Sequence, residues 1–589
     1  MHNPHADALV ERVVAFARER GWSTERTVSA VAAALGEAID LAPSIGRDAF
    51  GEKFPPDILV DLNDRGRGSS APWLLGLVYE RLLHPSARRS RGAHFTPADV
   101  AERLVSFALD DLGNATSDIT LCDPACGGGV FLLAMAAWLH ARGWSRVDAS
   151  RAVYGADIDP LAVEVSRAAL ALWRGGPDAS LASRVVTADL LVDATDVWPR
   201  STFTAVIGNP PFQNQLQRAT TRVGQARDAV GAITAASGPY TDTAALFLLR
   251  ALDLVGDGGR VALIQPQSTL VARDAIGVRE SISRRAAIHG LWFARDMIFA
   301  ANVRVCAAVL TRRNDVDRSS VDAQVARVCD REFRLVPPSA PPATSSSWAG
   351  LVADLLGTPI VDLVTSGQVG DIATATAGFR DEYYGLVGAV VERGDSIAAT
   401  PRLVTSGLID VLACHWGTRP ARFARVRYVA PVVDVDKVEG RVGVWVRARL
   451  RPKLLVATQT KVIEVVVDEV GDLVPSTPVI AVHADESQLW LLAAALTAPC
   501  VSAYALAQVA GAALGADAIK LAARQVLALP LPGDRALWER GATLAKLAQH
   551  AADDERRHLL DELGHTMDAA FGITDPAVFA WWAQRRGRD

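Results

Sequence analysis

The sequence predicts a mainly parallel α/β sheet over residues 91–315, with a helical region before it and a mixed α+β region after it. Short apolar runs alternate with stretches of helical periodicity in that segment, which is the pattern of strands and covering helices. Apolar residues recur at helical spacing over residues 1–90. A chain of 589 residues is too long for one hydrophobic core, so several domains are expected.

Six apolar runs in the α/β segment are expected to form strands. They are DITLCDPA, VYGADIDP, RVVTADLL, FTAVIGNPP, GRVALIQP and VCAAVLTRR. The helical stretches between them are GVFLLAMAAWLHARG, LAVEVSRAALALW and TAALFLLRALDLVG. Strands that alternate with helices in this way predict a sheet with helices on both faces.

The flanking segments carry weaker signals. Residues 1–90 are typical of an amphipathic helical region that only packs. Proline and serine are dense at 336–348, so a linker is expected at 316–350. Residues 351–533 combine the strand-like runs RVGVWVRARL, KLLVATQTKVIEVVVD and TPVIAVHA with the helical run SQLWLLAAALTAP. Residues 534–589 are expected to be a helical segment.

Composition restricts the class of protein. Half of the residues are apolar, which is typical of a globular chain, and the formal net charge of −5 gives no bulk sign of a nucleic-acid partner. The six cysteines are scattered and no histidine pair completes a zinc site, so a reducing compartment and no metal are expected. The start MHNPHADALVERVV lacks the pattern of a signal peptide, and no apolar run reaches transmembrane length. A cytoplasmic protein without a membrane partner is therefore expected.

The run LCDPACGGGVFLLAMAAWL predicts a strand, a glycine-rich turn and a helix. Such turns let a backbone approach a ligand closely, although the spacing is not that of a dinucleotide fingerprint. The next strand ends in YGADIDP, where an acidic residue is placed to hold a ribose diol. Asp157 is our choice for this role. Asp159 is the alternative, and it could instead cap the helix LAVEVSRAAL. Asp189, after the third strand, could meet the adenine of a nucleoside.

The run AVIGNPPFQNQ follows the fourth strand. Pro210 and Pro211 remove two backbone donors and fix two φ angles beside Asn209. A simple turn is the alternative, because Asn and Pro are common turn residues. A rigid backbone beside one amide and one aromatic ring, Phe212, suits a preorganised polar site.

Four of these motifs together carry a resemblance to a known family. DPACGGGVFL, GADIDP, TADLL and GNPPF resemble, in this order, the motifs of the amino-group DNA methyltransferases that use S-adenosylmethionine, in the adenine-N6 group. RGAHFTPADVAERLVSFAL upstream resembles the leading motif of the gamma-type arrangement, in which the cofactor motifs precede the catalytic one. The resemblance covers roughly residues 75–315 and implies a Rossmann-like S-adenosylmethionine-dependent methyltransferase domain at 91–315.

The resemblance implies a set of residues around S-adenosyl-L-methionine. The first four residues are expected at the methionine end, the fifth is the key glycine of the turn, and the last three are expected beside the ribose and adenine. They are Thr96, Pro97, Asp123, Ala125, Gly127, Asp157, Ile158 and Asp189.

The resemblance also implies a catalytic set of Asn209, Pro210, Pro211 and Phe212. The exocyclic amine of adenine is a poor nucleophile because its lone pair is delocalised into the ring. Two acceptors, the Asn209 side-chain oxygen and the Pro210 carbonyl, are expected to receive its two N–H groups. The target base must leave the duplex at a cost of a few kcal/mol. Stacking on Phe212 is expected to return about 1–3 kcal/mol.

Residues 351–533 more loosely resemble the target recognition domain of adenine methyltransferases of the TaqI type. Basic residues are dense there within an acidic chain, which suits phosphate contacts, although solvated strand faces are an alternative. The candidate DNA-binding residues are Arg419, Arg422, Arg447, Arg449, Arg451 and Lys453.

Together these features predict a site-specific adenine-N6 DNA methyltransferase (the EC 2.1.1.72 class), with double-stranded DNA as partner. A monomer on DNA, a nucleoid-associated place in the bacterial cytoplasm, and a setting in restriction-modification or phage defence with separate partner proteins are expected.

Two alternative functions remain open, an RNA guanine-N2 methyltransferase and a non-catalytic DNA-binding subunit. Two other activities are not supported by the sequence. Asp57 and Asp61 lack the E-x-K partner that an endonuclease needs. Cytosine-C5 chemistry needs a nucleophilic cysteine, usually after a proline. Cys500 follows a proline but lies far outside the expected catalytic segment.

Overall fold

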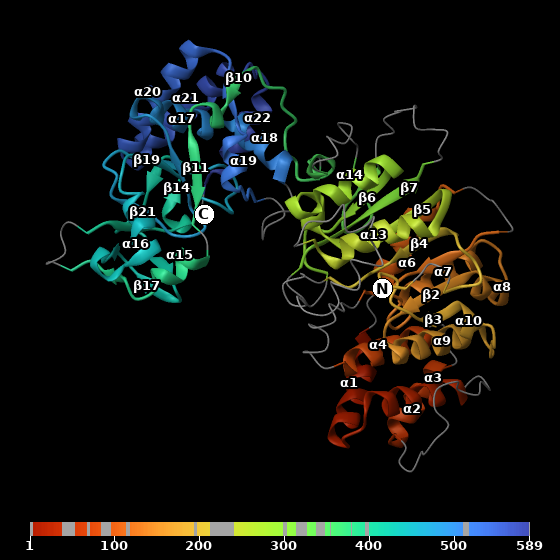
Figure 1. The fold of residues 1–589 in the computed structure, drawn as a ribbon. Coiled ribbons are helices and arrows are strands. Elements are labelled where there is room, and N and C mark those ends of the chain that lie inside the picture. Colours follow the sequence, from red (N-terminus) through yellow and green to blue (C-terminus); the bar gives the residue numbers. More distant parts are fainter. Residues whose placement is uncertain are drawn as a thin grey trace. The chain divides into compact units, whose positions relative to one another are not determined.

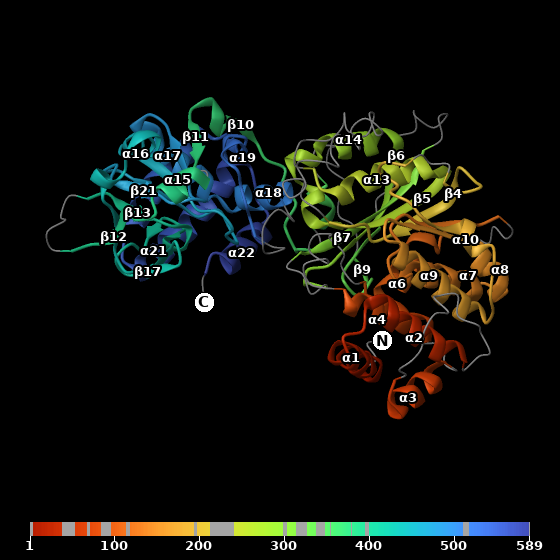
Figure 2. The same cartoon turned by 60° about the horizontal axis from the view of Figure 1, so that its bottom comes forward.

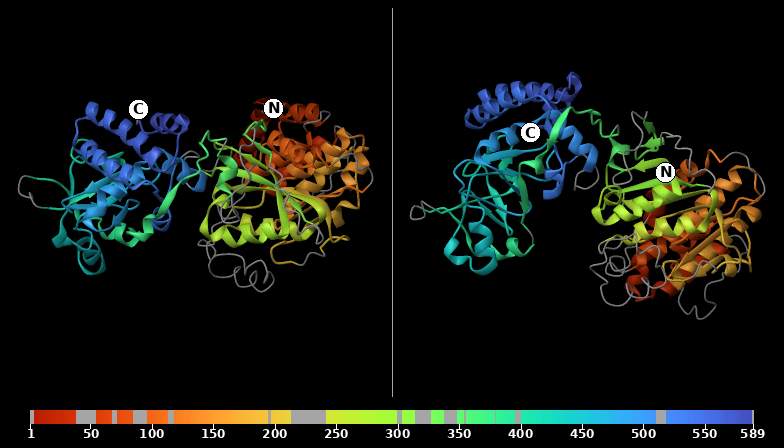
Figure 3. Two further views of the ribbon diagram at one scale, coloured as in Figure 1. Left: turned by 90° about the horizontal axis from the view of Figure 1, so that it is seen from above. Right: turned by 45° about the horizontal axis from the view of Figure 1, so that its top comes forward.

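The computed structural model describes residues 4–37, 54–66, 71–83, 96–112, 118–193, 197–212, 241–298, 303–313, 327–336, 348–353, 355–378, 380–394, 400–509 and 518–587. The chain divides into two compact units, Met1–Ser347 (unit 1) and Trp348–Asp589 (unit 2). Both units are drawn in Figure 1, and Figures 2 and 3 show them from other directions.

Unit 1 is built on a sheet that has nine strands within its described residues, in the order β3-β2-β1-β4-β5-β7-β6-β8-β9. The first five strands in this order are parallel, and β7 is antiparallel to both of its neighbours. The predicted mainly parallel α/β sheet is confirmed. The strands are β1 (Leu121–Asp123), β2 (Val153–Asp157), β3 (Val185–Thr187), β4 (Phe203–Gly208), β5 (Val255–Pro266), β6 (Ala286–Phe293), β7 (Val305–Arg312), β8 (Arg327–Cys329) and β9 (Leu335–Val336).

The end of the sheet differs from the prediction. Strand β8 pairs with β6, and β9 pairs with β8, so both belong to the sheet of unit 1. The expectation that residues 316–350 form a linker is therefore wrong for 327–336. These strands are only three and two residues long, which is too short for a period-2 pattern to reveal them.

Helices of unit 1 cover the sheet on both faces, as Figures 1 and 2 show. They are α1 (Pro4–Glu19), α2 (Thr24–Glu37), α3 (Pro56–Gly66), α4 (Ala71–Leu82), α6 (Ala98–Leu109), α7 (Val130–Ala141), α8 (Arg146–Arg151), α9 (Pro160–Arg174), α10 (Leu181–Arg184), α13 (Thr243–Leu254) and α14 (Ile276–Arg285). Buried residues of α1–α4 share one hydrophobic core with α6, α7 and α9. The N-terminal helices are thus part of unit 1 and not a separate domain.

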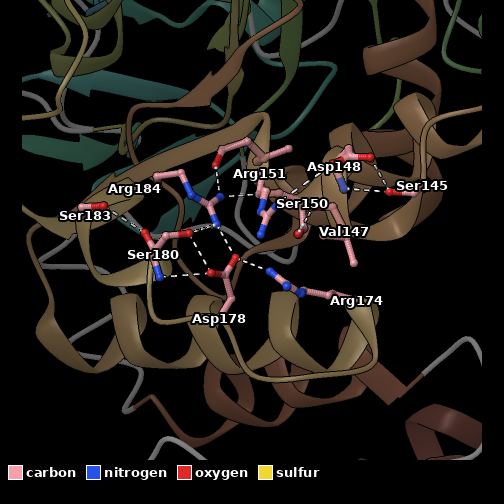
Figure 4. Close-up of polar contacts among 11 residues, drawn as sticks. Ser145, Val147, Asp148, Ser150, Arg151, Arg174, Asp178, Ser180, Ser183 and Arg184 are labelled. Carbon is pink, nitrogen blue, oxygen red and sulfur yellow. Dashed lines mark hydrogen bonds and ion pairs between the residues drawn. The ribbon is translucent and has the colours of Figure 1, made fainter.

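A buried arginine fixes the amino ends of β2 and β3, as Figure 4 shows. Arg184 donates to the carbonyl oxygens of Ser150 (2.5 Å) and Val153 (3.1 Å), and to the Asp178 carboxylate (2.7 Å). Arg174 also pairs with Asp178. Burial lowers the pKa of Arg184, and Asp178 is the main opposing charge. This network thus fixes the amino ends of β2 and β3 and leaves their carboxyl ends free of it.

Unit 2 is a mixed α+β unit with several small sheets. The two largest have four strands each among the described residues, in the orders β11-β22-β19-β20 and β12-β18-β13-β21. The strands are β10 (Thr365–Gln368), β11 (Thr374–Ala377), β12 (Val390–Glu392), β13 (Arg402–Val404), β14 (Ile409–Asp410), β15 (Ala413–Cys414), β16 (Ala421–Phe423), β17 (Val426–Tyr428), β18 (Pro431–Val433), β19 (Lys453–Val456), β20 (Val465–Asp468), β21 (Leu473–Pro475), β22 (Ile480–His483) and β23 (Pro530–Pro532).

The helices of unit 2 include α15 (Arg380–Gly385), α16 (Gly440–Arg447), α17 (Glu486–Thr497), α18 (Pro499–Val509), α19 (Ala523–Leu527), α20 (Arg535–His550), α21 (Asp553–Ala570) and α22 (Pro576–Arg585). The long helices α20 and α21 lie side by side (Figure 3, blue) and share a core with α17, α18 and α22. The helical C-terminal segment therefore packs within unit 2.

One strand expectation in unit 2 is wrong. The run RVGVWVRARL was expected as a strand, but its first seven residues belong to α16. Val444 is 63% exposed, whereas Gly443 and Val446 are buried, so burial follows the helical period.

Among the described residues, no single helix is both long and apolar enough to cross a bilayer. The pair α17 and α18, bent by 67°, passes the same length and composition test together.

Candidate functional site

The predicted cofactor and catalytic residues converge at one edge of the sheet of unit 1. Strand β1 lies between β2 and β4, and all three are parallel. Their carboxyl ends are Asp123, Asp157 and Gly208. Ligands of open α/β sheets bind at this edge, beside the strand ends.

The glycine turn after β1 leaves backbone open to a ligand. Gly127 has φ of 50° and Gly129 has φ of 87°, which are left-handed values that favour glycine. A Cβ atom on Gly127 would meet nothing within 4 Å, so its backbone borders open space. The Gly127 N–H donates to Asp157 Oδ2 at 2.9 Å, and Ser166 Oγ donates to the Gly127 carbonyl at 2.9 Å. Hydrogen bonds to Asp157 and Ser166 thus fix the turn, and the space beside Gly127 is open to a small ligand.

The two aspartates after β2 have different contacts. Asp157 receives the N–H of Gly127 on one oxygen and the N–H of Asp159 on the other, both at 2.9 Å. Asp159 accepts the N–H of Leu161 at 3.0 Å as the N-cap of α9, and the hydroxyl of Tyr79 at 2.9 Å. The capping role that the sequence left open for Asp159 is therefore present in the structure. Asp157 is the carboxylate beside the turn.

The remaining cofactor candidates lie near the same edge. Ile158 is 46% exposed beside Asp157, although an isoleucine is normally buried. Asp189 follows β3, the neighbour of β2, and accepts the N–H of Leu191 at 3.2 Å. The structure brings these residues to the edge where the resemblance expects the ribose and adenine, and their roles stay predictions.

Asp123 is buried between the glycine turn and the predicted catalytic set of Asn209, Pro210, Pro211 and Phe212, called the catalytic run below. It accepts the N–H of Ala125 at 3.0 Å, and burial raises its pKa to about 8. A Cβ atom on Gly208 would lie 2.3 Å from Asp123 Oδ1, so only glycine fits at the end of β4. Sequence reasoning missed this requirement, because it depends on a contact between two strands.

Asn209 is oriented by a residue of the leading motif. Its Nδ2 donates to Thr96 Oγ1 at 2.9 Å, and Thr96 is 2% exposed. Because the Asn209 Nδ2 atom faces Thr96, the Oδ1 atom of the same amide points away from Thr96. Pro97 then begins the turn into α6. The structure thereby links the leading motif to the catalytic run.

The rest of the catalytic run is largely buried. Pro210 is buried, Pro211 is half-buried, and Phe212 is 8% exposed within the core of unit 1. Stacking of a base on Phe212 stays a prediction. The polar residues of the run after Phe212 lie outside the described residues.

Two of the predicted DNA-binding residues face the interior of unit 2. Lys453 is fully buried and forms an ion pair with Asp468. Arg449 is 8% exposed, stacks over the Trp445 ring, and donates to Thr376 Oγ1 at 3.0 Å. Neither side chain can contact DNA in this arrangement. The expectation is wrong for both, because each is held by a partner on another element of unit 2.

The other four predicted residues differ in their contacts. Arg419 makes two hydrogen bonds to Asp410, at 3.0 and 2.7 Å. Arg451 is exposed and donates to His483 Nδ1 at 3.2 Å. Arg422 and Arg447 are exposed.

Strands β16 and β17 form an arginine-rich hairpin. Arg422 and Arg427 lie directly opposite each other, and Arg425 is at the tip with φ of 70°. Within the described part of the chain, none of the three makes an ion pair. Like charges that face each other across a hairpin destabilise it, unless an anionic partner approaches. Figure 1 labels β17 at this hairpin.

Comparison with known proteins agrees with the motifs of unit 1. Residues 71–327 match the model of the N-6 DNA methylase family. This segment is thus similar to the domains of that family. The type II methyltransferase M.VspI of Vibrio sp. (strain 343) is 26% identical over 187 residues, which are 32% of this chain and 40% of the relative. The chain thus matches less than half the length of that relative.

Solved structures resemble the chain beyond the methylase domain. The type IIL restriction-modification enzyme MmeI, in complex with DNA, has a TM-score of 0.63 at 12% identity and covers 99% of this chain and 98% of its own. The ATP-dependent type ISP restriction-modification enzyme LlaBIII, bound to DNA, has a TM-score of 0.50 at 10% identity, over 88% of this chain and 45% of its own. At these identities the likeness establishes the fold of the chain.

Proposed function

We propose that the protein is a site-specific DNA methyltransferase that methylates the N6 amino group of adenine in duplex DNA. The observation that carries this proposal is the position of Asn209 and its prolines. They follow β4 at the edge that holds the glycine turn, and Thr96 orients the Asn209 amide. The Asn209 Oδ1 atom and the Pro210 carbonyl would accept the two N–H groups of the target amine.

The residues at this edge fit S-adenosylmethionine. A nucleoside fits beside the open backbone of Gly127 and the Asp157 carboxylate, with Asp189 near the adenine. Asp123 and Thr96 would lie toward the methionine end. When bound, the cofactor supplies an electrophilic methyl group on a sulfonium centre. The contribution of the chain is to hold the amine in line with that methyl group, and proximity supplies much of the rate.

Unit 2 is proposed to bind DNA and select the site. The hairpin of β16 and β17 offers three exposed arginines, and phosphate contacts of this kind position a protein on a duplex. MmeI and LlaBIII are restriction-modification enzymes in complex with DNA and share the fold. A role in restriction-modification is therefore the proposed setting.

The proposal is tested by single-molecule sequencing of host DNA with and without the gene. N6-methyladenine at one sequence motif is expected only with the gene. Asn209→Ala should abolish the modification while calorimetry still detects S-adenosylmethionine binding. Asn63→Ala, in α3, is the matched control and should methylate normally. Methylation by the Asn209→Ala protein within tenfold of wild type would exclude this mechanism.

A further inference from the structure

We propose that helix α4 is part of the cofactor site, with Gly76 and Tyr79 as positioning residues for the glycine turn and the end of β2. This inference rests on the proposed function, because it assigns residues to the same cofactor site. Neither residue belongs to the motifs that carried the resemblance. The evidence is two independent contacts, one between backbones and one through a hydrogen-bond chain.

The first contact joins α4 directly to the glycine turn. A Cβ atom on Gly76 would lie 2.6 Å from the Gly128 carbonyl oxygen, and one on Gly128 would lie 2.9 Å from Gly76 Cα. Both residues must therefore be glycine for the two backbones to touch. Glycine is unfavourable inside a helix, so its presence at Gly76 needs a reason of this kind. The turn cannot move toward α4 without a clash.

The second contact runs through side chains. Tyr79 is 3% exposed, and its hydroxyl donates to Asp159 Oδ2 at 2.9 Å. The Asp159 N–H donates to Asp157 Oδ1 at 2.9 Å, and Asp157 Oδ2 receives the Gly127 N–H at 2.9 Å. A continuous path of hydrogen bonds thus leads from α4 to the backbone that borders the cofactor space. Figures 1 and 2 both show α4 beside α9, which Asp159 caps.

Helix α4 is in turn fixed by the helices before it. Arg81 donates to Glu11 at 2.8 Å, and Arg18 donates to the Arg81 carbonyl at 3.3 Å. Helices α1 and α2 contact α4 and share its core. Both helices lie before the segment that matches the methylase family model. Their role in this inference is to hold α4 against the cofactor turn.

The first test is Tyr79→Phe in the full chain. It removes one hydroxyl and keeps the ring, so the affinity for S-adenosylhomocysteine by calorimetry should fall about three- to tenfold. The kcat at saturating cofactor should stay within about twofold, because Tyr79 touches no reacting atom. Tyr383→Phe is the matched control, since its hydroxyl accepts a backbone N–H in unit 2 at 3.0 Å. That variant should bind S-adenosylhomocysteine like wild type.

A merely structural role would lower the melting temperature in both tyrosine variants and leave the cofactor affinity of both unchanged. That outcome overturns the inference. Asp159→Asn adds a second test, because asparagine keeps the N-cap of α9 and changes the partner of the hydroxyl. If Tyr79 acts through Asp159, the effects of the two substitutions on affinity should not add. Additive effects would contradict the proposed path.

Gly76→Ala tests the backbone contact separately. The added methyl group must displace the Gly128 carbonyl, so affinity should fall more than in Tyr79→Phe. Gly176→Ala is the control, since a Cβ there meets nothing within 4 Å. If wild type fails to bind S-adenosylhomocysteine, the proposed function fails and this inference with it. If wild type binds and both α4 variants bind equally well, only this inference fails.

Discussion

Polar side chains are held by different kinds of contact in the two units. This difference decides which functional residues can be predicted from the sequence. In unit 1, Asp123 and Asp157 lie at the ends of adjacent parallel strands. Each accepts a backbone N–H from two residues further along the chain, and Asp157 also accepts the N–H of Gly127 in the turn after β1. In unit 2, Lys453 and Arg449 are held by partners from other elements, Asp468 and Thr376. The positions of Asp157 and Asp123 can therefore be predicted from the order of the strands and the motif at each strand end. A cluster of arginines in the sequence does not say which of them face outward.

The largest expected effect would sharpen this contrast. Lys453→Ala leaves the Asp468 carboxylate buried without its cation, so the free energy of unfolding should fall by about 3–5 kcal/mol. Urea unfolding of the full chain measures it. Lys437→Ala, at an exposed ion pair with Asp434, is the control and should change by at most about 1 kcal/mol. A stable Lys453→Ala protein that binds DNA poorly would return Lys453 to the DNA-binding set.

The next effect concerns the buried carboxyl group of unit 1. Burial raises the pKa of Asp123 from its ordinary value of 3.8 to about 8. Between these values the folded state keeps a proton that the unfolded state has lost, so stability should fall as pH rises through this window. From about pH 5.5 to about pH 7.5 the expected loss is about 2–3 kcal/mol for this one group.

Asp123→Asn is the variant that tests this dependence. Asparagine still accepts the Ala125 N–H but cannot ionise, so the loss of stability with pH should become smaller. Urea unfolding at both pH values gives the comparison. The same pH dependence in wild type and in the variant would show that another group titrates in this range.

The third effect separates the two aspartates after β2. Asp157→Ala removes the acceptor for two backbone N–H groups, so cofactor affinity should fall about tenfold or more in calorimetry. Asp159→Ala removes the cap of α9 and should cost about 1 kcal/mol of stability. Unchanged affinity in Asp157→Ala would move the ribose contact elsewhere, with Asp159 next.

The parallel part of the sheet of unit 1 and the order of the motifs along it were predictable from the sequence, because β1, β2, β3 and β4 are each followed by their own motif. The contacts of Gly76 and Gly208 were not, since each depends on a neighbour more than fifty residues away in the chain. A helix-interior glycine at Gly76 was a signal that could have been used. The short strands β8 and β9 and the helix α16 were missed because their local patterns are too short or fit two periods.

The smallest expected effect tests the exposed charges of unit 2. Replacing Arg422, Arg425 and Arg427 of the hairpin by glutamine should weaken duplex binding and flatten its salt dependence. Each lost phosphate contact reduces the slope of log K against log salt by about 0.9. The free energy of unfolding should stay constant or rise slightly, because the facing pair of Arg422 and Arg427 no longer repels. Fluorescence anisotropy of a labelled duplex at several salt concentrations measures the slope.

Arg419→Gln is the control for this hairpin variant, because the Arg419 side chain is engaged by Asp410. It should lower stability and leave the salt slope near that of wild type. If the hairpin variant keeps the wild-type slope, DNA lies against another face of unit 2. The exposed Arg447 and Arg451 then become the candidates, since both remain accessible while Arg449 between them is buried. If the salt slope falls equally in both variants, the ion pair with Asp410 does not prevent Arg419 from binding DNA. Contacts within the chain would then not predict which arginines bind phosphate.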